Sequence, residues 1–285
     1  MVAVAEGLRS CHDFGHFSSY AKTIVVSTMV MRSAVAGPLY ALTEKNHALV
    51  ISAYYQSAVE ASNPVSSVRL KDGRIDARLQ RSLFQRTFTQ NCHKLRCHPS
   101  WSALYGMVQL PIWMIMTFGL RNAYWPPMIP EFLTEGLSSP STSLCLIAAT
   151  TFATGLNVEI THLKRVYAQT STTVVTSDPK LVNQNRIANV MPARMPWQLK
   201  FAHRVGHLGT ILIALFSPFA PSALVIFWCS SASHQLALHL LFLSNRVRGV
   251  LGIKKTPVDP KRPYFALWQI AKSHYRVLQL ISNRS

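Results

Sequence analysis

Residues 101–120 read WSALYGMVQLPIWMIMTFGL, and Gln109 is the only strongly polar side chain among them. An apolar stretch of about 20 residues is long enough to cross a hydrocarbon core about 30 Å thick as a helix. A helix that is apolar on all sides requires either lipid or a large soluble fold around it. This stretch therefore predicts a membrane-spanning helix, and the rest of the chain can be compared with it.

Four further stretches have nearly the length and apolar character of membrane helices. They are residues 23–42, interrupted by Arg32, and the weaker segments 142–158, 205–220 and 222–243. Soluble core helices can imitate the weaker segments. The distribution of charge along the chain discriminates between the two alternatives.

The composition is 49% hydrophobic and only 14% charged, with a formal net charge of +18. This balance fits either a nucleic-acid-binding protein with a large core or a membrane protein with basic loops. Nine Lys and Arg residues lie in 43–100, none in 122–141, seven in 159–204 and nine after residue 243. Basic loops face the side from which a membrane protein is inserted. We therefore predict an all-α polytopic membrane protein with its C-terminus on the basic side and its N-terminus opposite, and no DNA partner.

The basic segment 43–100 predicts a helical hairpin between the first two spans. Its first arm begins at His47, the Asn63-Pro64 pair indicates a turn, and the second arm carries apolar residues from Ile75 at helical spacing. A self-packed, solvated hairpin is one interpretation, and a basic platform for anionic lipid headgroups or an incoming chain is the other. We favour a mixture of the two, with lipid contact as the main use.

The tail, residues 244–285, combines a basic stretch with a predicted amphipathic helix. Its apolar stripe consists of Leu267, Ile270, Val277 and Ile281. Such a helix is typical of a membrane surface, and weak contact of the basic tail with ribosomal RNA is the alternative.

The N-terminal segment, residues 1–22, resembles neither a secretory signal nor a usual mitochondrial presequence, because Glu6 and Asp13 interrupt it.

Two Cys-His pairs, Cys92-His93 and Cys97-His98, form a CH-x3-CH pattern. A structural zinc site needs four convergent ligands at tighter spacing, so reduced thiols are the favoured interpretation. We predict no metal and no cofactor. Nucleotide-binding and hydrolase motifs are absent from the sequence, so an enzyme is not expected.

Arg32 lies in the middle of the first predicted span. Placing Arg at the centre of a bilayer helix costs about 2.5–3.5 kcal/mol on insertion scales. The side chain either reaches toward the interface, pairs with a carbonyl that a proline has freed, or faces a watery cavity. We predict the cavity, lined by Arg32, Thr28 one turn earlier, Gln109, Trp228 and Ser231. Helix–helix hydrogen bonding for Ser231 and core packing for Trp228 are the alternatives.

Several of these residues belong to blocks that resemble the YidC/Oxa/Alb membrane insertases. The most specific blocks are QLPIW at 109–113, FGLRN at 118–122 and FWCSS at 227–231, together with Thr28, Arg32, Pro38, Asn91-Cys92 and Cys97-His98-Pro99. The mitochondrial branch concerned with cytochrome c oxidase assembly, the Cox18 type, is the most similar. Residues 168–195 match nothing in the family, and we expect a flexible loop insertion there.

The resemblance implies a five-helix core over residues 23–243 in the mitochondrial inner membrane. The core would enclose a hydrophilic groove open to the matrix, lined by Arg32, Thr28, Gln109 and Trp228. The N-terminus would lie in the intermembrane space and the C-terminus, with the hairpin 43–100, in the matrix. It implies a chaperone-like insertase for newly made membrane proteins, with cytochrome c oxidase subunit II, whose acidic C-terminal region must be exported, as the expected client.

Two other functions remain compatible with the sequence. A transporter of small anions would use Arg32 as its binding residue, although such proteins usually contain an internal repeat that is not visible here. A passive scaffold would hold an oxidase subunit that is already inserted. Anionic lipids, and weakly the mitochondrial ribosome through the basic tail, are the other expected partners.

Overall fold

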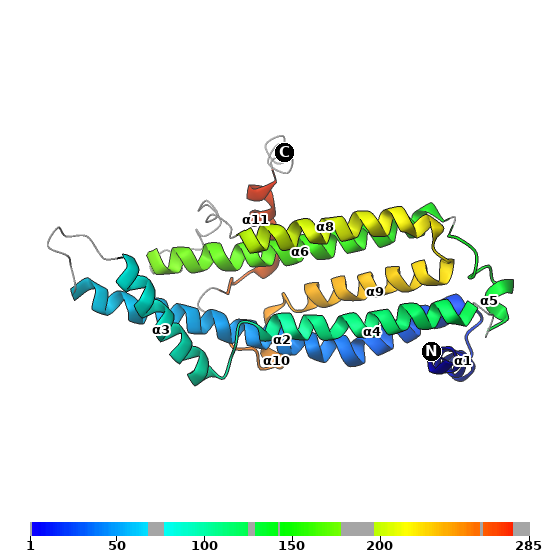
Figure 1. The fold of residues 1–285 in the computed structure, drawn as a ribbon, viewed down its shortest axis with the longest axis horizontal. Helices are drawn as coiled ribbons and strands as arrows, with labels where there is room; N and C mark the ends of the chain where they lie inside the picture. The colour runs from blue at the N-terminus through cyan, green and yellow to red at the C-terminus, as the bar shows by residue number, and fades with distance from the viewer. Residues whose placement is uncertain are drawn as a thin grey trace. The chain divides into compact units, whose positions relative to one another are not determined.

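The computed structural model describes residues 2–67, 77–124, 129–141, 143–177, 197–256 and 259–275. Every named element in these ranges is a helix, and the only β-type pairing among them is an isolated bridge between Pro140 and Pro221. This confirms the predicted all-α class. Figure 1 shows the helices with their labels.

The chain divides into two compact units. Unit one contains residues 1–40, 105–162 and 196–241, and unit two contains residues 41–104, 163–195 and 242–285. The helices that contribute to unit one are α1 (Val2–Gly15), α2 (Tyr20–Ser67), α4 (Trp101–Tyr124), α5 (Glu131–Thr134), α6 (Leu144–Ser177), α8 (Trp197–Phe216), η2 (Ser217–Phe219) and α9 (Ser222–Leu241).

Helix α9 lies at the centre of unit one. It contacts α4 through stacked rings of Trp228 and Trp113, and it contacts α6 where Asn157 Nδ2 donates a 2.8 Å hydrogen bond to the Ala232 carbonyl. Helix α8 runs alongside α6 (Figure 1), with Gly206 against Val158. Helix α9 also contacts α2, where His234 Nε2 lies 2.9 Å from Ser33 Oγ, so it touches helices from three different parts of the chain.

One end of unit one is closed by a loop that pairs with the start of α9. Backbone hydrogen bonds of 2.9–3.0 Å join Ser222 N to Ser139 O, Ala223 N to Leu137 O and Ser141 N to Ala220 O. Phe132 of α5 and Phe227 of α9 are almost completely buried in the apolar core beneath this loop. The bonds satisfy backbone groups at the start of α9 that a helix leaves without partners.

Unit two contains α3 (Ala77–Leu95), α10 (Asn245–Val250) and α11 (Pro263–His274), with the later parts of α2 and α6. Helix α3 packs on α2, because Tyr54 and Phe84 meet edge to face and Asn91 Nδ2 donates to Ser57 Oγ at 3.0 Å. Helix α11 packs on α6 through an apolar cluster. Its buried members are Leu163, Val166, Ile270 and Ala271.

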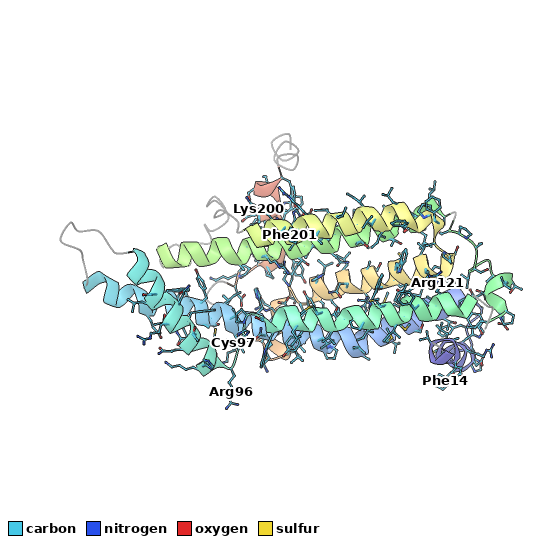
Figure 2. All side chains as sticks on the ribbon, viewed as in Figure 1. Phe14, Arg96, Cys97, Arg121, Lys200 and Phe201 are labelled. Carbon is cyan, nitrogen blue, oxygen red and sulfur yellow. The ribbon has the colours of Figure 1, made fainter. Side chains whose placement is uncertain are left out.

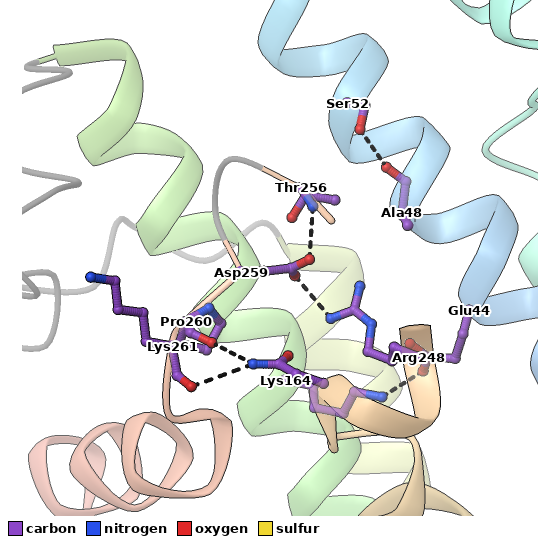
Figure 3. A network of polar contacts seen from close by, with 10 residues as sticks. Glu44, Ala48, Ser52, Lys164, Arg248, Thr256, Asp259, Pro260 and Lys261 are labelled. Carbon is purple, nitrogen blue, oxygen red and sulfur yellow. Dashed lines mark hydrogen bonds and ion pairs between the residues drawn. The ribbon is translucent and has the colours of Figure 1, made fainter. Parts of the chain in front are cut away.

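A polar network joins further segments of unit two (Figure 3). Arg248 donates a 2.9 Å hydrogen bond to Asp259 Oδ1, and the other carboxylate oxygen accepts the Thr256 N–H at 2.7 Å. Lys164 of α6 forms an ion pair with Glu44 of α2. Charged groups are therefore neutralised in pairs where these segments meet.

Within the described residues, three helices are long and apolar enough to cross a membrane. They are Tyr20–Ser57 within α2, Leu144–Ala168 within α6, and α9. The predicted second span, 101–120, falls on α4, and the predicted fourth span, 205–220, falls on the end of α8 and on η2. Neither α4 nor α8 is among these three helices. The five-span topology therefore stays a prediction.

The predicted turn at Asn63-Pro64 is wrong, because α2 continues as one 48-residue helix to Ser67. Asn91 of α3 hydrogen-bonds to both Ser57 and Glu60, so packing along this last part of α2 outweighs the local turn signal. The turn between the arms falls outside the described residues.

The predicted loop insertion at 168–195 is also wrong in its first part, because α6 remains helical to Ser177. Residues 178–195 lie outside the described part of the chain.

In the tail, Leu267 and Ile270 pack against α6 rather than facing outward, while Val277 and Ile281 are not described. An adjacent surface of α11 exposes Tyr264, Phe265 and Trp268.

Candidate functional site

Arg32 and Gln109 line one cavity in unit one, formed by α2, α4 and α9. The cavity volume is about 20 Å³, enough for a single water molecule. The remaining lining is apolar: Met31, Val35, Ala36, Ile112, Trp113 and Phe227. Two polar side chains thus meet in surroundings that are otherwise hydrophobic.

Arg32 is half-buried on α2, and no carboxylate among the described residues forms an ion pair with it. A guanidinium removed from water without an anionic partner is unfavourable. It is therefore tolerated best where water or a polar ligand can reach it. The shared cavity with Gln109 is such a place.

A proline lies two residues after Gln109 in the same helix. Pro111 lies inside α4 and has no N–H, so the carbonyl of Met107 loses its usual helical hydrogen bond. Such a carbonyl is tolerated at membrane depth only beside protein or water. The QLP motif thus places a side-chain amide close to a weakened part of the helix.

The structure does not place the other three predicted groove residues in this cavity. Thr28 is fully buried, and its hydroxyl donates a 2.6 Å hydrogen bond to the Ile24 carbonyl of the same helix. Ser231 is buried within α9. Trp228 follows the cavity residue Phe227, and its buried indole N–H has no acceptor among the described residues.

Two histidines of α9 connect this helix to α2. His234 Nε2 lies 2.9 Å from Ser33 Oγ, and His239 Nδ1 lies 2.6 Å from the Tyr40 hydroxyl. Both histidines therefore have a hydrogen-bond partner on the neighbouring helix. Since Ser33 is adjacent to Arg32, these two hydrogen-bonded pairs extend the polar contacts from the cavity along α2 and α9.

The CH-x3-CH pattern does not form one cluster of ligands. Cys92 and Cys97 are buried together in an apolar cluster with Ala53, while His93 is exposed. Arg96 between them has φ 51° and projects away from the ribbon (Figure 2). Burial raises the pKa of the Cys97 thiol to about 11, and the neighbouring Cys92 adds to the shift.

Sequence reasoning missed a second cluster, in which Glu159 of α6 meets His203 and His207 of α8. The spacing of the two histidines, four residues apart on a helix, places them on one face and is visible in the sequence. Their meeting with Glu159 depends on the packing of α8 on α6.

Comparison with known proteins supports a distant relationship to one curated protein. Human "Cytochrome c oxidase assembly protein COX18, mitochondrial" is 24% identical over 258 residues, which cover 85% of this chain and 70% of the human protein. No protein-family model matches the chain. This similarity to the human protein agrees with the family resemblance that the sequence motifs indicate. Since it covers 85% of the chain, it includes parts of both units.

Proposed function

We propose that this chain is a mitochondrial inner-membrane insertase that assists cytochrome c oxidase assembly. Its expected client is cytochrome c oxidase subunit II, whose acidic C-terminal region it would help across the membrane. The similarity to human COX18 supports the role in oxidase assembly. The observation that carries the insertion step is the cavity that Arg32 shares with Gln109.

The proposed mechanism lowers a solvation barrier and breaks no covalent bond. A hydrophilic client segment avoids part of its dehydration cost where it meets Arg32 and Gln109. The guanidinium attracts acidic groups transiently, because no carboxylate of the described chain neutralises it. The small cavity would have to widen to admit a peptide, by separation of α2 from α4.

The membrane potential supplies a direction for the transfer. Moving one elementary charge across the membrane is worth about 2.3 kcal/mol per 100 mV. Because the matrix is electrically negative, acidic segments are driven outward. The proposed topology has five spans, with α4 and α8 as the second and fourth, the N-terminus in the intermembrane space and the C-terminus in the matrix.

The arrangement of charges supports this orientation. The segments 43–100 and 244–285 carry nine basic residues each, whereas residues 122–141 carry none. In the matrix these basic segments would meet anionic lipid headgroups, and the tail could also touch the mitochondrial ribosome. The exposed Tyr264, Phe265 and Trp268 on α11 fit contact with a lipid surface.

Site-specific photo-crosslinking during client synthesis in isolated mitochondria tests the proposal. A photoreactive residue at Gln109 should crosslink transiently to newly made subunit II. Met114 is the matched control, because it is exposed on the same helix and does not line the cavity. Equal crosslinking from both positions, or none from Gln109, would contradict the proposal. A passive scaffold would instead give crosslinks that persist after the client tail has been exported.

A further inference from the structure

The side chains of Glu159, His203 and His207 converge on one point between α6 and α8. Glu159 Oε1 lies 2.7 Å from His207 Nε2 and 3.3 Å from His203 Nε2. The two Nε2 atoms are 2.9 Å apart. Three potential ligand atoms therefore form a compact triangle, and no fourth protein ligand within the described residues belongs to the group.

Hydrogen bonds alone do not account for this triangle. A neutral imidazole nitrogen either donates a proton or accepts one, and a carboxylate only accepts. If His207 Nε2 donates to Glu159, His203 Nε2 can accept from His207 but then faces the carboxylate with its lone pair. If both nitrogens carry protons, they oppose each other at 2.9 Å. While the Glu159 carboxyl group is ionised, one of the three contacts is therefore unfavourable whichever imidazole nitrogens carry protons.

A metal ion removes this conflict, because all three atoms then direct lone pairs toward it. Ligand distances in zinc sites are about 2.0–2.2 Å, which separates tetrahedral ligands by about 3.4 Å. The observed separations of 2.7–3.3 Å would each have to increase to this value, by at most about 0.7 Å. Two imidazoles and one carboxylate suit Zn²⁺ and related divalent transition metals.

The surroundings hold the three groups at this point. A Cβ on Gly206 would lie 2.8 Å from Val158 Cγ1, so the absence of a side chain lets α8 approach α6 beside Glu159. The His162 ring stacks on the His203 ring with centroids 3.8 Å apart. Glu159, His203 and His207 remain 22–40% exposed, which leaves space for water or another ligand.

We propose that Glu159, His203 and His207 bind one divalent transition-metal ion, such as Zn²⁺, and that the ion links α6 to α8. Bound metal would favour the paired state of the two helices over any state in which they separate. The site shares no residue with the Arg32 cavity, so it does not depend on the proposed function.

Cobalt titration of the full-length chain in lipid nanodiscs tests the site, with Zn²⁺ as the competitor. We expect one Co²⁺ per chain with visible d–d absorption bands that Zn²⁺ abolishes, and a higher melting temperature with metal bound. His207→Gln and Glu159→Gln should each weaken binding at least tenfold at unchanged helix content. The Cys92→Ser, Cys97→Ser double variant is the control and should bind as the wild type does.

His207→Cys separates loss of a ligand from loss of fold. A thiolate is itself a zinc and cobalt ligand, so this variant should retain binding and add a sulfur-to-cobalt charge-transfer band. Unchanged affinity in His207→Gln would overturn the site, as would the absence of saturable Co²⁺ or Zn²⁺ binding by the wild type. Loss of binding only in the cysteine double variant would assign the metal elsewhere.

Discussion

Arg32 on α2 and Gln109 on α4 line the same small cavity, although they come from segments far apart in the sequence. Apolar side chains make up the rest of the lining, so the two polar groups provide the only side-chain polarity there. A positive charge in such a place interacts more strongly with an incoming anion than it would in bulk water, because the local dielectric constant is lower. The proposed insertion step depends on this contrast.

Substitution of Gly206 should loosen the pairing of α8 with α6. A Cβ at this position would lie 2.8 Å from Val158 Cγ1 and 3.1 Å from Cγ2, and the branched valine cannot move aside freely. Gly206→Ala should therefore lower the free energy of unfolding by about 1–3 kcal/mol. Thermal unfolding in detergent measures the change.

Gly209 of the same helix is the matched control. No atom lies within 4 Å of a Cβ built there, so Gly209→Ala adds helix propensity without a clash. It should raise stability by up to about 1 kcal/mol. Changes of the same sign and size in both variants would contradict the close approach of α8 to α6 at Gly206.

Removal of Arg248 should release the tail segment of unit two. Its Nη1 lies 2.9 Å from Asp259 Oδ1, and the two side chains are only 17% and 18% exposed. In Arg248→Ala the Asp259 carboxylate keeps its hydrogen bond from the Thr256 N–H but loses its cationic partner. We expect the free energy of unfolding to fall by about 1–3 kcal/mol, which is less than the cost of breaking a deeply buried ion pair.

Hydrogen exchange of the α11 backbone amides measures this effect, and it should become faster in Arg248→Ala. Arg246→Ala is the control, because Arg246 is exposed on the same short helix, α10. If exchange in α11 is equally fast in the two variants, the Arg248–Asp259 pair does not hold the tail.

Alkylation of Cys97 should depend steeply on pH. Burial, together with Cys92, raises the pKa of its thiol to about 11. Only the thiolate reacts, so about 0.1% of Cys97 is reactive at pH 8, and the rate should rise about tenfold per pH unit up to about pH 11. Mass spectrometry after iodoacetamide treatment measures the rate.

Cys11 provides the comparison within the same sample, because it is exposed. It should be modified at pH 8 long before Cys97. Equal rates at pH 8 would show that the Cys97 thiol is neither buried nor raised in pKa.

Hydrophobic length and charge alternation in the sequence were sufficient to predict the helical class. Residues 222–243 coincide closely with α9, and the apolar stretch 101–120 lies within α4. Local sequence signals gave a wrong prediction where tertiary contacts determine the secondary structure. Asn63-Pro64 resembles a turn, but the contacts of Asn91 with Ser57 and Glu60 accompany a helix that continues past it.

The site residues show the same limit. An arginine within an apolar span and a glutamine beside a helix proline were sufficient to predict that Arg32 and Gln109 lie near each other, and both line one cavity. Thr28 has the right position on the helix, but its hydroxyl bonds to its own backbone, which spacing alone does not reveal. The Glu159–His203–His207 cluster depends on α8 packing on α6 at Gly206, and no local pattern predicts that contact.

The most direct test of the central claim is export of the acidic tail of subunit II in mitochondria that carry variants of Arg32. Protease added outside the inner membrane cleaves only an exported tail. Arg32→Ala should reduce the cleaved fraction strongly, whereas Arg32→Lys should retain much of it, because a positive charge is what the mechanism requires. Lys22→Ala, an exposed cation on the same helix, should leave export unchanged. Normal export in Arg32→Ala, with the protein present at wild-type abundance, would contradict the account.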